Sequence, residues 1–337
     1  MIGKRIRLWK DGEYDYPGAY GFIPFMVSYI HEDQSSRPGM LIAPGGAYRR
    51  VSPSEAHLPA EEFYRAGYNV FVLAYTVNYL DEPLKLQPLA DISRAVRMIR
   101  AGAVRWHIDP EKIAVCGFSA GGHLCASLCV HYKDTEDPAR EYSRISNRPD
   151  AAVLCYPVIT AGEYSNRESF LALLGEHPAD RELEYLSLEA HVTGDVPPCF
   201  LWHTVGDATV PAENTYLFAD ACRKAGVPYA QHVFTEGIHG LSTATERWIL
   251  RDFGQPYTLE QIRFLAEAVK AGKTDLPPGR GEEILEEFGL AGKKKEKWTP
   301  EMKEKLYGTI QEVGVWTELA EKWLARRLKL SLAGEEI

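Results

Sequence analysis

The chain has 337 residues, of which 45% are hydrophobic, and its formal net charge at pH 7 is -9. This length can form one large packed domain or two small ones, and the acidic charge argues against a broad nucleic-acid-binding surface. No segment is apolar enough over a sufficient length to predict a membrane span or a signal peptide. We therefore expect a cytoplasmic protein without nucleic-acid or membrane partners.

The six cysteines have neither zinc-ribbon nor Cys-X-X-Cys spacing. Cys116, Cys155 and Cys199 lie in apolar, strand-like runs, and Cys125 and Cys129 lie one helical turn apart. Reduced thiols in a hydrophobic core explain this pattern better than disulfides or a metal site. We expect no metal site.

Strand and helix patterns alternate along the first two thirds of the chain. The first 37 residues predict antiparallel strands, separated by glycine and proline turn signals. Apolar runs then alternate with amphipathic stretches, which predicts a mainly parallel sheet with helices on both faces, an α/β fold. The expected strands are 5–9, 24–30, 39–43, 68–75, 112–118, 150–156, 198–203 and 229–234, and the longer expected helices are 88–108 and 211–225.

Two segments interrupt this rhythm within what we expect to be a single domain, 1–337. Residues 158–197 are irregular and polar, and we interpret them as an excursion over the face of the sheet that would carry an active site. Residues 245–312 predict a helical insertion, and residues 313–330 predict a final core helix with an apolar stripe.

Two local signals mark the starts of expected helices in the insertion. Thr258 and Gln261 have the spacing of a capping box, and Thr299 precedes a proline at a predicted helix start. A short helix is expected at 282–288, and residues 292–297 predict a basic loop whose lysines 293–295 are solvated.

The sequence Gly117-Phe118-Ser119-Ala120-Gly121 matches the pattern Gly-X-Ser-X-Gly. An apolar strand precedes it and a helix can begin directly after it, as in a nucleophile elbow, where a strained turn exposes the serine hydroxyl. Glycines are needed on both sides because the strand and helix backbones pass close to the turn. We therefore predict that Ser119 is a nucleophile.

A nucleophilic serine needs a base that takes its proton and a third group that orients the base. In proteins with this elbow the acid precedes the histidine in the chain. Asp207 lies between a predicted strand and a predicted helix, and His239 lies in the loop after the last strand, flanked by Gly237 and Gly240. The expected triad is Ser119, His239 and Asp207.

Other residues compete for these roles. Asp207 could instead cap the following helix, with Asp195 or Asp220 orienting the base. Three further histidines are better explained as packed side chains: His123, His203 and His232.

The tetrahedral intermediate of acyl transfer needs backbone N–H donors around its oxyanion. Ala120, directly after the serine, is one candidate, and the loop Pro44-Gly45-Gly46-Ala47-Tyr48 offers Gly45 or Gly46, with Ala47 as a competitor. Weaker candidates for the substrate pocket are Ala47, Tyr48, Tyr75 and Asn78, although a buried packing role explains Tyr48 equally well.

These motifs resemble those of α/β-hydrolases of the esterase and lipase superfamily. The resemblance is narrower to the bacterial acetyl esterase group, also called acetylxylan esterase or feruloyl esterase-like, in which Pro-Gly-Gly-Ala-Tyr replaces His-Gly-Gly-Gly. The matching segments are 44–48, 117–124, 206–211 and 236–241, within a resemblance that covers about 20–243 and the last helix.

The resemblance implies a cofactor-free esterase that hydrolyses short acyl esters, acetyl groups on sugars or oligosaccharides above all. It leaves open an exopeptidase or amidase with the same triad, a long-chain lipase, and a non-catalytic binding protein of the same fold. The insertion could be a lid, a dimer surface or extra core, so a homo-oligomer also stays open.

Overall fold

The computed structural model describes residues 3–80, 82–292 and 298–330, and eight strands in them form one sheet. The order across the sheet is β1-β2-β4-β3-β5-β6-β7-β8. The strands are β1 (Arg5–Arg7), β2 (Phe25–Tyr29), β3 (Arg37–Ala43), β4 (Asn69–Ala74), β5 (Ile108–Phe118), β6 (Ala151–Cys155), β7 (Cys199–Thr204) and β8 (Tyr229–Phe234).

The sheet is mainly parallel, as predicted. Only the pairs β1–β2 and β2–β4 are antiparallel among the described strands. Central strand β5 lies between β3 and β6, with Gly117 opposite Ala43 and Phe118 opposite Cys155. The loops that follow β3, β5 and β6 therefore meet at one edge of the sheet, where open α/β sheets form their sites.

Eleven α-helices occur in the described residues. They are α1 (His57–Arg65), α2 (Gln87–Ala101), α3 (Ala120–His131), α4 (Arg167–Leu174), α5 (Asp180–Leu186), α6 (Glu213–Ala225), α7 (Glu246–Ile249), α8 (Glu260–Lys270), α9 (Arg280–Glu287), α10 (Pro300–Val313) and α11 (Trp316–Arg327). Five short 3₁₀ turns join them: η1 (Pro17–Ala19), η2 (Pro53–Glu55), η3 (Tyr132–Asp134), η4 (Leu188–His191) and η5 (Tyr257–Leu259).

Helices cover both faces of the sheet. One hydrophobic cluster joins the side chains of α2, α3 and α6 to one face, and a second joins those of α1 and α11 to the other. Alternate residues of β5 divide accordingly, with Val115 in the first cluster and Cys116 in the second. All six cysteines are buried free thiols, and none of the described helices has the length and apolarity that a membrane span requires.

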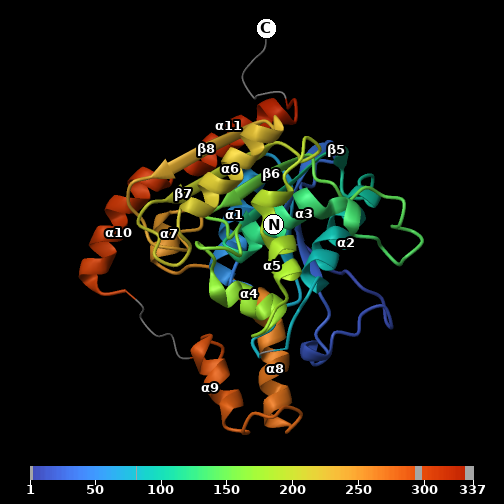
Figure 1. Ribbon diagram of the computed structural model, residues 1–337, viewed down its shortest axis with the longest axis vertical. Helices are drawn as coiled ribbons and strands as arrows, with labels where there is room; N and C mark the ends of the chain where they lie inside the picture. The colour runs from blue at the N-terminus through green and yellow to red at the C-terminus, as the bar shows by residue number, and fades with distance from the viewer. Residues whose placement is uncertain (1–2, 81, 293–297, 331–337) are drawn as a thin grey trace.

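Helices α8 and α9 form a small third cluster outside these layers. Apolar residues of both helices pack together there with Tyr20, Tyr79 and Leu80. Figure 1 shows this pair (orange) at one end of the molecule and α11 (red) at the other. The predicted insertion 245–312 contains α7 to α10, and its basic residues 293–297 lie outside the described residues.

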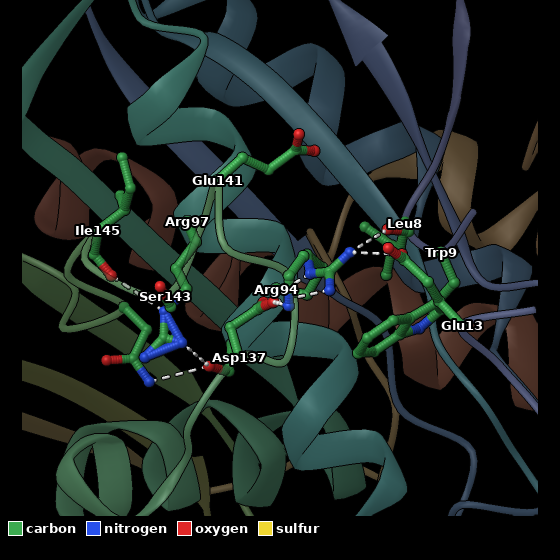
Figure 2. Close-up of polar contacts among 12 residues, drawn as sticks. Leu8, Trp9, Glu13, Arg94, Arg97, Asp137, Glu141, Ser143 and Ile145 are labelled. Atoms are coloured by element: carbon green, nitrogen blue, oxygen red, sulfur yellow. Dashed lines mark hydrogen bonds and ion pairs between the residues drawn. The ribbon is translucent and has the colours of Figure 1, made fainter.

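Arg94 of α2 forms a buried ion pair with Asp137 and also holds the N-terminal segment. Arg94 donates to both carboxylate oxygens of Asp137, at 2.5 and 2.7 Å, and to the carbonyl of Leu8 at 3.0 Å. Glu13 accepts from the same guanidinium, and the ring of Trp9 lies against it (Figure 2). With several hydrogen bonds and only 1% of its side chain exposed, Arg94 is paired as a buried charge must be.

The predicted helix 88–108 is too long. Helix α2 ends at Ala101, with Gly102 as its C-cap. The Trp106 ring occupies the space into which a side chain at position 102 would point. Val104, counted as part of the helix, is 91% exposed, and Ile108 already belongs to β5.

The predicted capping box at Thr258 is also wrong. Helix α8 begins at Glu260, and the Gln261 amide instead bonds both the N–H and the C=O of Val77. The short helix expected at 282–288 is α9, two residues earlier at its start. Helix α10 begins at Pro300 as predicted, and the Thr299 side chain caps it by accepting from the N–H of Met302.

Candidate active site

Ser119 occupies a strained turn between β5 and α3. Its backbone angles, φ 54° and ψ -120°, are costly for a residue with a side chain. Two backbone hydrogen bonds hold it there: its N–H donates to the carbonyl of Cys155 at 3.0 Å, and its carbonyl accepts from Val158 at 3.1 Å. These hydrogen bonds to the end of β6 and the residues after it thus stabilise the strained backbone of Ser119.

The glycines of the elbow are required by close backbone approach. A Cβ atom at Gly121 would lie 2.0 Å from the carbonyl oxygen of Ala43, and one at Gly117 would lie 2.2 Å from that of Gly121. Helix α3 therefore begins directly against the ends of β3 and β5, which brings Ser119 beside the loop after β3.

Ser119, His239 and Asp207 form a continuous hydrogen-bonded chain. Nε2 of His239 lies 2.7 Å from Oγ of Ser119, and Nδ1 lies 2.6 Å from Oδ2 of Asp207. Ser119 is 7% exposed, and the side chain of Asp207 is almost completely buried. These are the distances that a base and its orienting carboxylate require.

Several donors converge on the carboxylate of Asp207. Burial by itself raises its pKa, but hydrogen bonds from His203, His239 and the N–H of Val210 outweigh burial and hold the pKa well below its usual range. Oδ1 accepts from Thr209 and Val210, both at 2.9 Å, so Asp207 also orders the turn before α6. The carboxylate of Asp207 is therefore ionised in the folded protein at neutral pH.

The competing acids have other partners. Asp195 pairs with Lys133, and Asp220 pairs with Arg223 and Lys224 on the exposed side of α6. Among the described residues, the carboxylate that His239 contacts is that of Asp207.

The other histidines are largely packed side chains, as the sequence suggested. His203 is fully buried and bonds the carbonyl of Val210 and the hydroxyl of Thr215, although its Nε2 also lies 3.4 Å from Asp207. His123 is buried beneath the elbow and His232 lies against the Phe200 ring. Burial lowers the pKa of His123 to about 4, so it is neutral at physiological pH.

Gly45 and Gly46 differ as candidate oxyanion donors. The N–H of Gly45 donates to Oε2 of Glu55 at 2.8 Å, so it is already used. Its carbonyl accepts from Ser52 at 2.9 Å, and the N–H of Gly46 must then point the opposite way across the trans peptide. The expectation for Gly45 is thus corrected in favour of Gly46 or Ala47, with Ala120 at the start of α3 as the second donor.

The predicted pocket residues Tyr48, Tyr75 and Asn78 are buried, at 3% exposure or less. The Tyr48 hydroxyl bonds Nδ1 of His123 at 2.9 Å, and the Tyr75 hydroxyl donates to the carbonyl of Pro44 at 2.6 Å. The Asn78 amide donates to a backbone carbonyl. Tyr48 and Tyr75 are thus packed against α3 and the loop after β3, whereas Asn78 bonds a different segment and lines a small hollow beside α8. Of the four predicted pocket residues, Ala47 is the partly exposed one.

Sequence reasoning missed two residues at this site, Glu55 and Tyr156. Glu55 is 3% exposed and its second oxygen accepts from the Tyr156 hydroxyl at 2.7 Å. The Tyr156 ring lies edge-on to the His239 ring, with 5.0 Å between centroids. The sequence could have indicated Tyr156, because it directly follows the strand next to the elbow. Nothing in the sequence around Glu55 distinguishes it from an ordinary loop residue.

The sheet order, the serine at the strand-to-helix turn and the acid and histidine after β7 and β8 define an α/β-hydrolase fold. The chain belongs to the BD-FAE family, whose model matches residues 28–222.

Two curated relatives have names that describe an activity. Endo-1,4-beta-xylanase B of Butyrivibrio fibrisolvens is 48% identical over 261 residues, which are 77% of this chain and 41% of that protein. The acetylxylan esterase of Xylanibacter ruminicola is 28% identical over 226 residues, 65% of this chain and 44% of that protein. This chain therefore spans less than half the length of these two curated relatives.

Among solved structures, the acetyl ester-xyloside bifunctional hydrolase of Caldicellulosiruptor lactoaceticus is similar over most of its length. It is 36% identical, with a TM-score of 0.68, and the match covers 78% of this chain and 97% of that one.

Proposed function

We propose that this chain is a carboxylic ester hydrolase that removes short acyl groups, acetyl groups first among them, from sugars or oligosaccharides. The observation that carries the proposal is the hydrogen-bonded chain from Ser119 Oγ through His239 to Asp207, at 2.7 and 2.6 Å. It supplies a nucleophile, a base and an orienting carboxylate in the order that acyl transfer needs.

In the proposed reaction, Oγ of Ser119 attacks the ester carbonyl while Nε2 of His239 takes the hydroxyl proton. The oxyanion of the tetrahedral intermediate accepts hydrogen bonds from the N–H of Ala120 and from that of Gly46 or Ala47. His239 then gives the proton to the departing alcohol oxygen, and an acyl-Ser119 remains. Water, deprotonated by His239, attacks this acyl group, and the acid leaves as the serine regains its proton.

The substrate class is supported by the named relatives and by the setting of Ser119. Two of these proteins are named for acetyl esters, and all three are named for xylan or xyloside substrates. Ser119 is 7% exposed, and a Cβ atom at Gly45 would lie 2.8 Å from that of Ser119. A small acyl group suits such a closely covered hydroxyl better than a long chain.

Hydrolysis of p-nitrophenyl acetate, butyrate and octanoate at neutral pH tests the proposal. We expect acetate to be preferred and Ser119→Ala to lower kcat by about three orders of magnitude or more. Release of acetate from acetylated xylo-oligosaccharides then tests the sugar. Inactivity on all three esters would contradict the proposal, and cleavage of aminoacyl p-nitroanilides would replace it with the peptidase alternative.

A further inference from the structure

Glu55 is a buried carboxylate in contact with two loops of the candidate site. It ends the 3₁₀ turn η2, is 3% exposed, and accepts a hydrogen bond on each oxygen. Neither bond comes from a cationic side chain, which is an expensive arrangement for a buried acid. A residue kept at such a cost is a candidate for a functional role.

One oxygen of Glu55 holds the loop after β3, residues 44–52, which we call the oxyanion loop. The peptide between Pro44 and Gly45 is held at both ends, because Tyr75 donates to its carbonyl at 2.6 Å and Glu55 accepts from its N–H at 2.8 Å. Among the residues that the structure describes, the next peptide is held by its carbonyl alone, which accepts from Ser52. Its N–H, that of Gly46, has no partner among them, and the bonds on the neighbouring groups set its direction.

The other oxygen of Glu55 reaches residues 235–244, which we call the histidine loop. The Tyr156 hydroxyl donates to Glu55 at 2.7 Å and accepts from the N–H of Ser242 at 3.0 Å. Ser242 also donates through its hydroxyl to the carbonyl of Ser54 at 2.6 Å, next to Glu55. The Tyr156 ring meanwhile lies against His239.

We propose that Glu55 is a positioning residue that holds the oxyanion loop and the histidine loop in the relative geometry needed for acyl transfer. This inference rests on the proposed esterase function. It assigns to Glu55 no contact with the substrate; the residue acts through Gly45 on one side and through Tyr156 and Ser242 on the other.

Electrostatics support the same role. Burial raises the pKa of Glu55 above its usual value, and the hydrogen bond from Tyr156 and the charges of His239 and Arg50 offset only part of this rise. An ionised Glu55 attracts the imidazolium that forms when Ser119 loses its proton, and so adds to the effect of Asp207. Both of its bonds are donated to it, which again suits the carboxylate.

The test compares Glu55→Ala and Glu55→Gln with Asp137→Ala, which removes the buried carboxylate that pairs with Arg94 (Figure 2). Misplaced oxyanion donors weaken the transition state and not substrate binding, so we expect Glu55→Ala to lower kcat about 100-fold with KM changed less than about threefold. Glu55→Gln can still accept one of the two bonds, and its kcat should stay within about tenfold of wild type. Asp137→Ala should lower the melting temperature without changing kcat.

Hydrogen exchange of the same proteins, followed by mass spectrometry, gives a readout independent of ester hydrolysis. Glu55→Ala should speed exchange in both 44–56 and 235–244, and Tyr156→Phe in 235–244 alone, each without an effect on α2. If Glu55→Ala does not fold, the kcat values and the hydrogen exchange of Glu55→Gln and Tyr156→Phe test the inference in its place.

Two results overturn the inference: a kcat loss in Glu55→Ala no larger than in Asp137→Ala, or unchanged exchange in either loop. An inactive wild-type protein whose loops still loosen in Glu55→Ala would instead refute the esterase function and leave Glu55 as the link between the loops.

Discussion

Oδ2 of Asp207 lies 2.6 Å from Nδ1 of His239, and this contact fixes which nitrogen of the ring faces Ser119. Because the carboxylate accepts, Nδ1 carries the proton, and Nε2 is left as the acceptor for the serine hydroxyl.

Asp207→Asn should therefore lower kcat by about three to four orders of magnitude with little change in KM, since the amide favours the wrong tautomer. Steady-state kinetics with p-nitrophenyl acetate measures this. Asp195→Asn and Asp220→Asn, which remove exposed carboxylates paired with lysine or arginine, are matched controls and should keep wild-type rates. A larger loss in either control would move the orienting role away from Asp207.

The local sequence pattern was sufficient for the parts of the site that lie next to strand ends. Ser119, Asp207 and His239 each follow a strand of the parallel sheet, so alternation of strands and helices already places them at one edge. The glycines around Ser119 carried the same information, because close backbone approach leaves no room for Cβ atoms.

What sequence could not predict depends on contacts between distant segments. Glu55 follows Ser52-Pro53-Ser54, a polar stretch, and its burial comes from Tyr156, about a hundred positions later. Gln261 had the spacing of a cap, yet its amide satisfies the backbone of Val77, 184 residues away. The end of α2 is a different case, because Gly102 directly after Ala101 is a helix-stop signal in the sequence itself, and the prediction ran past it.

Gly121→Ala should be severely destabilising. The new Cβ atom would lie 2.0 Å from the carbonyl oxygen of Ala43 and 2.5 Å from that of Pro44, and backbone atoms cannot move aside cheaply. We expect a loss of about 3 kcal/mol or more in the free energy of unfolding, measured by urea denaturation.

The matched control is Gly308→Ala on the exposed side of α10, where nothing lies within 4 Å of the new Cβ atom. It should stabilise the protein by up to about 1 kcal/mol, because alanine favours a helix. Equal changes in unfolding free energy for the two substitutions would show that the start of α3 is not in close backbone contact with the end of β3.

Gln261→Ala should also cost stability, by about 2 kcal/mol, because it leaves the buried N–H and C=O of Val77 without their partner. Thermal or urea unfolding of the variant measures the loss. Thr258→Val is the control: the Thr258 hydroxyl has no hydrogen-bond partner among the described residues, so its removal should be neutral within about 0.5 kcal/mol. A costly Thr258→Val beside a neutral Gln261→Ala would restore the capping-box interpretation.

Asp91 should make stability depend on pH between about 4 and 7. This carboxylate is fully buried, and burial raises its pKa to about 6 in spite of hydrogen bonds from Thr76, Gln87 and Trp9. An unfolded Asp titrates near 3.9, so at intermediate pH the folded chain binds a proton that the unfolded chain has lost. The stabilisation is therefore complete below about pH 4 and is lost as the pH rises through about 6.

Asp91→Asn resembles the protonated acid and removes this titration, so the measurement is the unfolding free energy of wild type minus that of the variant. This difference in unfolding free energy should fall by about 3 kcal/mol between pH 3.5 and pH 7.5 and stay constant at higher pH. The pKa of Asp91 differs by about two units between the folded and unfolded chain, and each unit corresponds to about 1.4 kcal/mol. Other titrating groups occur in both proteins and cancel. A difference that rises with pH would mean that the donors around Asp91 outweigh its burial and keep the carboxylate ionised in the core.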